Sequence, residues 1–155
     1  MNLNEIMELN KDNKPIKFVC IGSSRIIIDC FGPFVGTFLQ ELGMPKYMVE
    51  GTLSNDINAK NITKNINNYQ DYFVVAIGSC CPKENDDFGD IKYENKTFKP
   101  GSAMGNEICE LGNCRIVMVT EFNDQMLINI GVIYERAKEV ALNIFHYFQL
   151  REMRI

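Results

Sequence analysis

The stretch FVCIGSSRIIIDCFGPFVG, residues 18–36, predicts a strand, a loop and the beginning of a helix in direct succession. The run KFVCIG (17–22) is short, apolar and ends in glycine, which is typical of a strand buried on both faces. After the loop, the segment 32–43 has Pro33 in its first helical turn and Gly43 at its end, as helices prefer. A buried strand followed at once by a helix indicates an α/β fold.

Similar units follow along the chain. The other predicted elements are strands at 47–52, 71–78, 115–122 and near 90–94, a short helix over about 57–68, and a long helix from 124 to about 149. Strands that alternate with helices in this way predict a mainly parallel sheet covered on both faces.

The composition fits one domain. The chain has 155 residues, of which 46% are hydrophobic, so we expect a single domain over 1–155 with a polar N-terminal extension at 1–16. The net charge of −4, from 20 acidic and 16 basic residues, leaves no basic stripe, and nucleic acid is not an expected partner. No apolar run reaches the roughly 18 residues of a membrane span, and the N-terminus lacks a signal peptide's apolar segment. We therefore expect no membrane partner, a cytoplasmic location and reduced cysteines.

Asp29 is the carboxylate that this topology brings closest to a binding site. In parallel sheets, ligands bind at the carboxyl ends of strands, here the loops after Gly22 and Gly78. Asp29 lies in the first loop, just before a helix whose N-terminal amides favour an anion, and Ser79 lies in the second. The residues alone leave two interpretations open: a helix cap, or a functional carboxylate with a partner.

Four segments in the same order resemble the YyaC-type sporulation proteins, relatives of the germination protease of spore-forming bacteria. They are FVCIGSSRIIIDCFGPFVGTFL, EGTLSNDINAKNI, FVVAIGSCC and FKPGSAMGNEICELGNCRI, and the resemblance covers about 18–145. It implies a three-layer α/β/α sandwich of the phosphorylase/hydrolase-like type, shared with hydrogenase-maturation peptidases, and an acid-type peptidase site made of two carboxylates. Asp29 matches the first of these carboxylates. The other positions that the resemblance places at the site are Ser24, Asn58, Gly78, Ser79, Gly101 and Ser102.

Four positions at which the family pattern has ionisable side chains are neutral in this chain. Gly78 stands where the pattern has the second catalytic aspartate, and Ser24, Asn58 and Asn113 stand where it has an aspartate, a histidine and another aspartate. An acid-type peptidase needs one carboxylate to take a proton from water and a second group to stabilise the oxyanion, which Asp29 alone cannot provide. We therefore expect a catalytically degenerate homologue without metal or cofactor that binds a peptide or protein, with small spore proteins as candidate partners.

A replacement carboxylate is the first alternative that the sequence leaves open. An active spore peptidase with an altered acid site would need a second acid from Glu50 or from the acidic loop residues Asp86, Asp87 and Asp90. A serine or cysteine triad is not expected, because the only histidine, His146, lies late in the predicted final helix.

A thiol or metal-binding protein is the second alternative. Cys30 follows Asp29, and Cys80 and Cys81 follow Gly78, so strand ends can bring soft metal ligands to one pocket. Against this, adjacent cysteines on an extended chain point in opposite directions, and a free cysteine is commonly a small buried apolar residue.

Overall fold

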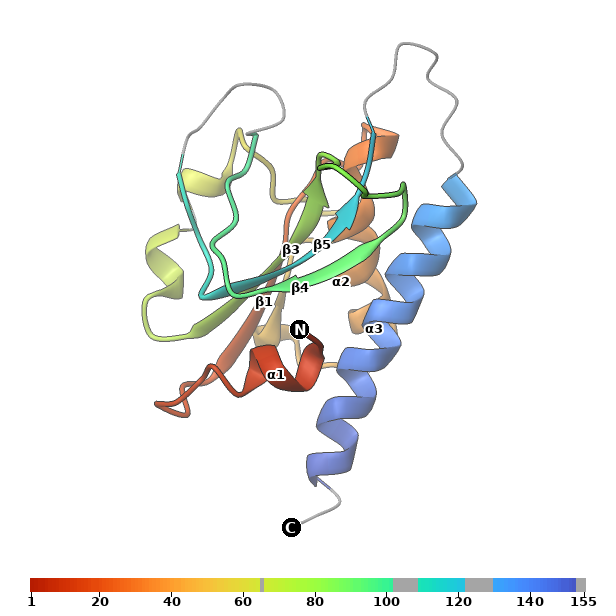
Figure 1. The fold of residues 1–155 in the computed structure, drawn as a ribbon. Coiled ribbons are helices and arrows are strands. Elements are labelled where there is room, and N and C mark those ends of the chain that lie inside the picture. The colour runs from red at the N-terminus through yellow and green to blue at the C-terminus, as the bar shows by residue number, and fades with distance from the viewer. Residues whose placement is uncertain (65, 102–108, 122–129, 153–155) are drawn as a thin grey trace.

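A mostly parallel sheet forms the centre of the protein, as the computed structural model shows for residues 1–64, 66–101, 109–121 and 130–152 (Figure 1). Its strands are β1 (Ile16–Cys20), β2 (Val49–Glu50), β3 (Phe73–Cys80), β4 (Ile91–Glu94) and β5 (Cys114–Val119). The order across the sheet is β2-β1-β3-β5-β4, and only β4 runs antiparallel to its neighbour. The expected mainly parallel sheet is confirmed.

Helices and short 3₁₀ turns cover the two faces of this sheet. In the described ranges they are α1 (Leu3–Met7), α2 (Phe31–Glu41), α3 (Ile130–Glu152), η1 (Ile27–Asp29), η2 (Lys46–Met48), η3 (Ile62–Lys64) and η4 (Ile66–Tyr69). Side chains alternate along β1, so Phe18 and Cys20 pack with α2 and α3, while Val19 and Ile21 pack with η3 and η4 on the other face. The three-layer α/β fold is therefore confirmed; among the described residues, 3₁₀ turns and irregular chain cover the second face.

In the predicted helix over 57–68, the described residues 57–64 and 66–68 do not form an α-helix. This region holds η3 and η4, and local side-chain bonds explain the difference. The side chain of Asn61 accepts from the Asn58 N–H at 2.9 Å, and that of Asn58 accepts from the Lys60 N–H at 2.9 Å. Asparagine side chains that bond to nearby backbone groups in this way compete with helical hydrogen bonds.

The N-terminal segment belongs to the core and is not merely a polar extension. In α1, Ile6 is 0% exposed and Met7 5% exposed, and both pack in the cluster between the sheet and α3. Asn2 and Glu5 form a reciprocal capping box at the beginning of this short helix. A helix of five residues is stable here because its apolar side chains are buried by the rest of the protein.

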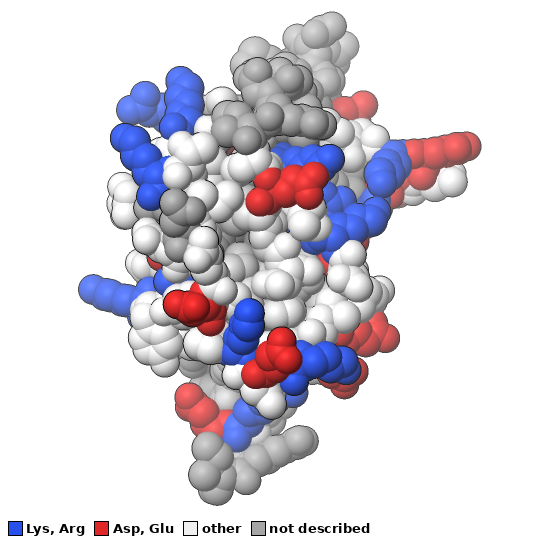
Figure 2. Space-filling model, turned by 90° about the vertical axis from the view of Figure 1, so that its left-hand side faces the viewer, with Lys and Arg blue, Asp and Glu red and all other residues white. Residues whose placement is uncertain are grey.

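The long final helix, α3, covers the sheet beside α2 (Figure 1). Its buried residues recur at helical spacing, and its other side carries charged residues and the exposed His146. Residues 122–129, which include the predicted beginning of this helix, lie outside the described ranges. Within those ranges, no helix combines the length and the apolar character needed to cross a membrane. Figure 2 shows acidic and basic side chains interspersed around an uncharged centre on the face that carries η3 and η4.

Two glycines bring α2, β1 and the chain after β2 into close contact. A Cβ on Gly36 of α2 would lie 1.8 Å from the carbonyl oxygen of Gly51. A Cβ on Gly51, whose φ is +90°, would lie 1.9 Å from the carbonyl oxygen of Cys20. Because glycine has no Cβ at either position, α2, the end of β1 and the turn after β2 can meet at one corner of the sheet.

Candidate acid site at the strand ends

Asp29 lies in η1, in the loop that follows β1. The backbone N–H of Ser23 donates to Asp29 Oδ2 at 3.1 Å and to the Asp29 carbonyl at 3.0 Å. Burial raises the pKa of Asp29 to about 6; the bond from Ser23 opposes this shift, and the nearby charge of Asp56 adds to it. The N-cap residue of α2 is Cys30, with no side-chain capping bond, so Asp29 ties the loop and does not cap the helix.

Asp56 is a second carboxylate at this site, and it was not among the residues that the sequence indicated. Its Oδ2 accepts from the Ser24 N–H at 2.8 Å and from Ser24 Oγ at 3.1 Å. A parallel bridge between Ile21 and Ile57 brings the chain after β2 to the end of β1. The only available sequence signal was the place of Asp56 in EGTLSNDINAKNI, one of the segments that carries the family resemblance.

The expected neighbour Asn58 is joined to this site through Asn61. Asn61 accepts from the Asn58 N–H, and its side-chain amide donates to the Asp56 carbonyl at 2.9 Å. The structure thus brings together Asp29, Ser24, Asp56 and Asn58. Their roles in binding stay a prediction.

Gly78 lies in β3 against an aromatic ring. A Cβ at this position would lie 2.6 Å from Phe98 Cζ and 3.2 Å from the carbonyl oxygen of Ile21. Gly101 follows in the turn after Phe98, with a φ of +76°. Ser102, also predicted to line the site, lies outside the described residues. Phe98 therefore fills the space that a side chain at position 78 would need.

Ser79 and Asn113 lie at different places in the sheet: Ser79 is near the end of β3, and Asn113 comes just before β5. Side chains alternate along β3, so Ser79 points to the face covered by α2 and α3, where its Oγ is buried without a hydrogen-bond partner among the described residues. Asn113 lies at the beginning of β5, where its Oδ1 accepts from the Val74 N–H at 2.8 Å. Asn113 therefore stabilises the end of the sheet at which β3 and β5 begin.

The carboxylates considered as replacements form other contacts. Glu50 accepts from Lys17 at 3.1 Å and from the Tyr69 hydroxyl. In the turn 86–90, Lys92 donates a hydrogen bond to the Asp86 carboxylate and so lowers the pKa of Asp86. These contacts give Glu50 and Asp86 structural partners, whereas Asp56 reaches the loop of Asp29.

The cysteines do not gather around Asp29. Cys30 packs on the face of α2, where its thiol donates to the Ile27 carbonyl, while Cys80 contacts the core on the opposite face and Cys81 is exposed. Burial raises the pKa of Cys30 to about 11 and also raises that of Cys80, which favours neutral thiols. In the described part of the chain, no three histidine, cysteine or acidic residues lie close enough to hold a metal ion.

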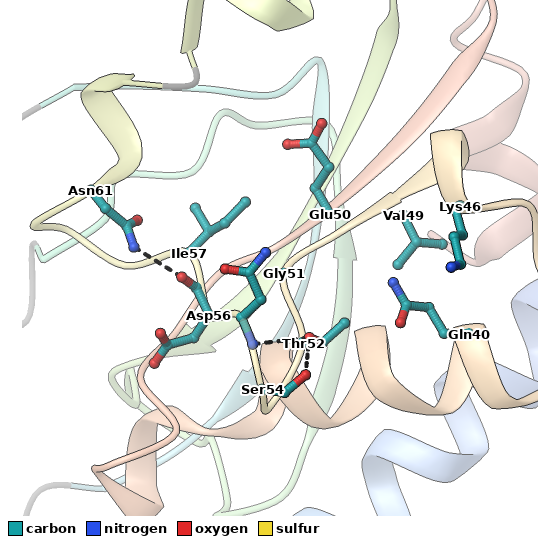
Figure 3. A pocket seen from close by; sticks show the side chains of 11 residues that line it. Gln40, Lys46, Val49, Glu50, Gly51, Thr52, Ser54, Asp56, Ile57 and Asn61 are labelled. Atoms are coloured by element: carbon teal, nitrogen blue, oxygen red, sulfur yellow. Dashed lines mark hydrogen bonds between the residues drawn. The ribbon is translucent and has the colours of Figure 1, made fainter.

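A cavity of about 540 Å³ lies beside β2 and reaches Asp56 (Figure 3). We call it the β2 cavity; its main polar side chains are Gln40, Lys46, Glu50, Asn55, Asp56 and Asn61. Because Asp56 both lines this cavity and contacts Ser24, the cavity adjoins the loop that carries Asp29. The acid site and the β2 cavity are neighbouring parts of one surface.

Comparisons with known proteins agree with this architecture. The family model "Protein of unknown function (DUF1256)" matches residues 2–142. The uncharacterized protein YyaC of Bacillus subtilis (strain 168) is 32% identical over 107 residues, which are 66% of this chain and 52% of that protein. The chain thus spans about half the length of this relative.

A solved structure shares the fold. The NiFe hydrogenase maturation protease HycI from Thermococcus kodakarensis KOD1 superposes with a TM-score of 0.52 and 16% identity, over 92% of this chain and 97% of that one. At this level of identity the likeness concerns the fold alone. The chain therefore belongs to the DUF1256 family, is related to YyaC, and has the α/β fold of a hydrogenase maturation protease.

Proposed function

We propose that this protein is a catalytically degenerate member of a peptidase-like family that binds a peptide or protein at the carboxyl ends of β1 and β3. The observation that carries the proposal is the contact between Gly78 and Phe98. Where an acid-type site would have its second carboxylate, a Cβ would lie 2.6 Å from an aromatic ring. The position is filled by an apolar group that neither moves a proton nor stabilises an oxyanion.

The remaining acid is suited to binding. With its pKa raised to about 6, the half-buried carboxyl group of Asp29 is partly protonated near neutral pH and can donate to or accept from a peptide group. The resemblance to sporulation proteins makes small spore proteins the first partners to test, in the cytoplasm of sporulating cells.

A second candidate function, peptide hydrolysis, is favoured by one observation. The charge of Asp56 contributes to the raised pKa of Asp29, so the two carboxyl groups interact. In this candidate, Asp56 takes a proton from the attacking water, while protonated Asp29 donates to the substrate carbonyl. Asp56 would then replace the acid that is absent at Gly78.

One experiment separates the two functions. The purified protein and its Asp29→Asn and Asp56→Asn variants are incubated with small spore proteins, with binding measured by fluorescence anisotropy and cleavage by mass spectrometry. We expect binding by the wild type and no cleavage. Cleavage that is lost in both variants would establish the acid pair and refute the degenerate site. Neither binding nor cleavage would contradict both functions.

A further inference from the structure

The β2 cavity has opposite charges at its two sides. Figure 3 shows Lys46 and Gln40 on one side and Asp56 with Asn61 on the other. Both bonds from Ser24 end on Asp56 Oδ2, and no residue in the described ranges bonds to Oδ1. The Lys46 ammonium likewise has no ion pair within those ranges. One anion and one cation are thus available to a ligand.

The place of the cavity in the fold favours an extended ligand. Among the strands that the structure describes, β2 lies at the edge of the sheet and pairs with β1 alone. Extended peptides bind along such edges because the strand offers backbone groups there. The side-chain amides of Gln40 and Asn55 add donors and acceptors that suit a peptide backbone.

Asp56 connects this cavity with the proposed peptide-binding site. Its carboxylate accepts a hydrogen bond from the Ser24 N–H. The N–H of Ser23, the residue before Ser24, donates to the Asp29 carboxylate. A chain that lies in the β2 cavity with one end near Asp56 therefore comes close to the loop of Asp29. One continuous peptide can reach both parts of the surface.

We infer that the β2 cavity selects a peptide segment that carries one basic and one acidic side chain, with the basic one at Asp56 and the acidic one at Lys46. The inference rests on the proposed function and names its ligand class. Opposite charges on the ligand and the cavity match at both sides, whereas a peptide with two like charges meets repulsion at one of them.

Four sets of synthetic peptides test this selection. They share one polar sequence of about eight residues, enough to span the cavity in extended form, and the spacing of two variable positions is scanned. These positions carry Lys and Glu, Lys and Gln, Gln and Glu, or Gln and Gln. We expect the Lys/Glu set to bind most tightly by fluorescence anisotropy, and each neutralised charge to lower affinity about two- to fivefold, as for partly exposed ion pairs.

Protein variants then assign each charge to its partner. In Asp56→Asn, the preference for peptides with Lys over those with Gln should vanish, while the preference for Glu over Gln persists. In Lys46→Gln, the preference for Glu over Gln should vanish, while the preference for Lys over Gln persists. Asp71→Asn and Lys11→Gln remove exposed charges that do not line the cavity, and both should behave as the wild type. Because each protein variant is measured with each peptide set, the design separates the loss of one contact from a general effect of net charge.

Three outcomes would overturn the inference: no peptide binds, wild-type affinity is the same for all four sets, or the control variants lose the preferences as well. Binding of small spore proteins that Asp56→Asn and Lys46→Gln leave unchanged would also overturn it, while the proposed function would stand. Peptide binding with the expected preferences, together with no binding of spore proteins, would support the cavity and contradict the proposed partner.

Discussion

At the scale of single residues, Asp29 is a carboxyl group whose pKa is raised by burial. Its pKa is about 6 in the folded protein and about 4 in an unfolded chain. The folded state therefore holds the proton to higher pH. The contribution of protonated Asp29 to the free energy of unfolding is fully present below about pH 4 and is lost as the pH rises through about 6.

Asp29→Asn should remove this pH dependence, because asparagine never ionises and keeps an oxygen that accepts from Ser23. Relative to the wild type, the variant should gain about 1–2 kcal/mol of unfolding free energy between about pH 4 and 7, after allowance for partial solvent exposure. Denaturant unfolding across this range measures the difference. Asp71→Asn is the exposed control and should show no such trend. A constant difference for Asp29→Asn would mean that burial does not perturb its carboxyl group.

Gly78 is predicted to be sensitive to any side chain because of Phe98. Gly78→Ala should lower stability by about 1–3 kcal/mol, the usual cost of an overpacked core, and Gly78→Asp should cost more because its carboxylate would also lose water. In a Phe98→Ala background the alanine substitution should cost much less. Unfolding free energies of the single and double variants give the coupling. Additive effects would show that the ring does not limit this position.

Sequence reasoning located Asp29 but not Asp56. A strand followed by a helix places the loop between them at a strand end, so position 29 was predictable from local pattern. Asp56 reaches the same place through the bridge between Ile21 and Ile57, a contact between distant segments that no periodicity reveals.

At the scale of elements, the contact of α2 with the turn after β2 depends on Gly36. Alanine normally favours a helix over glycine by about 1 kcal/mol, but here its Cβ would lie 1.8 Å from the Gly51 carbonyl oxygen. The clash should dominate, and Gly36→Ala should lower stability by about 1–3 kcal/mol in thermal or denaturant unfolding.

Gly43, just after the same helix, provides the matched control. Its φ is +93° and a Cβ there would meet nothing within 4 Å, so Gly43→Ala should carry backbone strain of about 1 kcal/mol and no clash. A variant of Gly36 as stable as the wild type would mean that α2 is free to shift away from the turn.

The prediction of elements succeeded where burial and local pattern agree. β1, β3 and β5 are mostly apolar and buried, each with a neighbouring strand on both sides, and their positions matched within a few residues. The prediction of a helix over 57–68 was wrong because asparagine side chains form the local hydrogen bonds there. A count of apolar residues does not include them.

At the scale of the whole molecule, the N-terminal helix closes the core over α3. Ile6→Ala should lower the unfolding free energy by about 2–4 kcal/mol, because the side chain is fully buried and its removal leaves a cavity. Glu8→Ala changes an exposed residue beside it and should alter stability by less than about 0.5 kcal/mol. Equal, small effects in denaturant unfolding would show that the first residues do not contribute to the fold.

The layers of the molecule were predictable in part. Alternating strands and helices indicated a covered parallel sheet, and the family resemblance implied three layers. The burial of Ile6 was not predictable, since the helix that carries it, α1, contacts β4 and α3, which lie far along the chain. Such long-range packing depends on the assembled shape rather than on local pattern.

The burial of the thiols also makes the protein convenient to label. Of the six cysteines, Cys81 is the exposed one, while Cys20, Cys30 and Cys114 are buried and Cys80 and Cys109 are half-buried. A maleimide dye at limiting concentration should therefore attach first to Cys81, at the end of β3, as peptide mass mapping would verify. This single attachment point would allow a fluorophore or spin label to report on the strand ends without engineered cysteines.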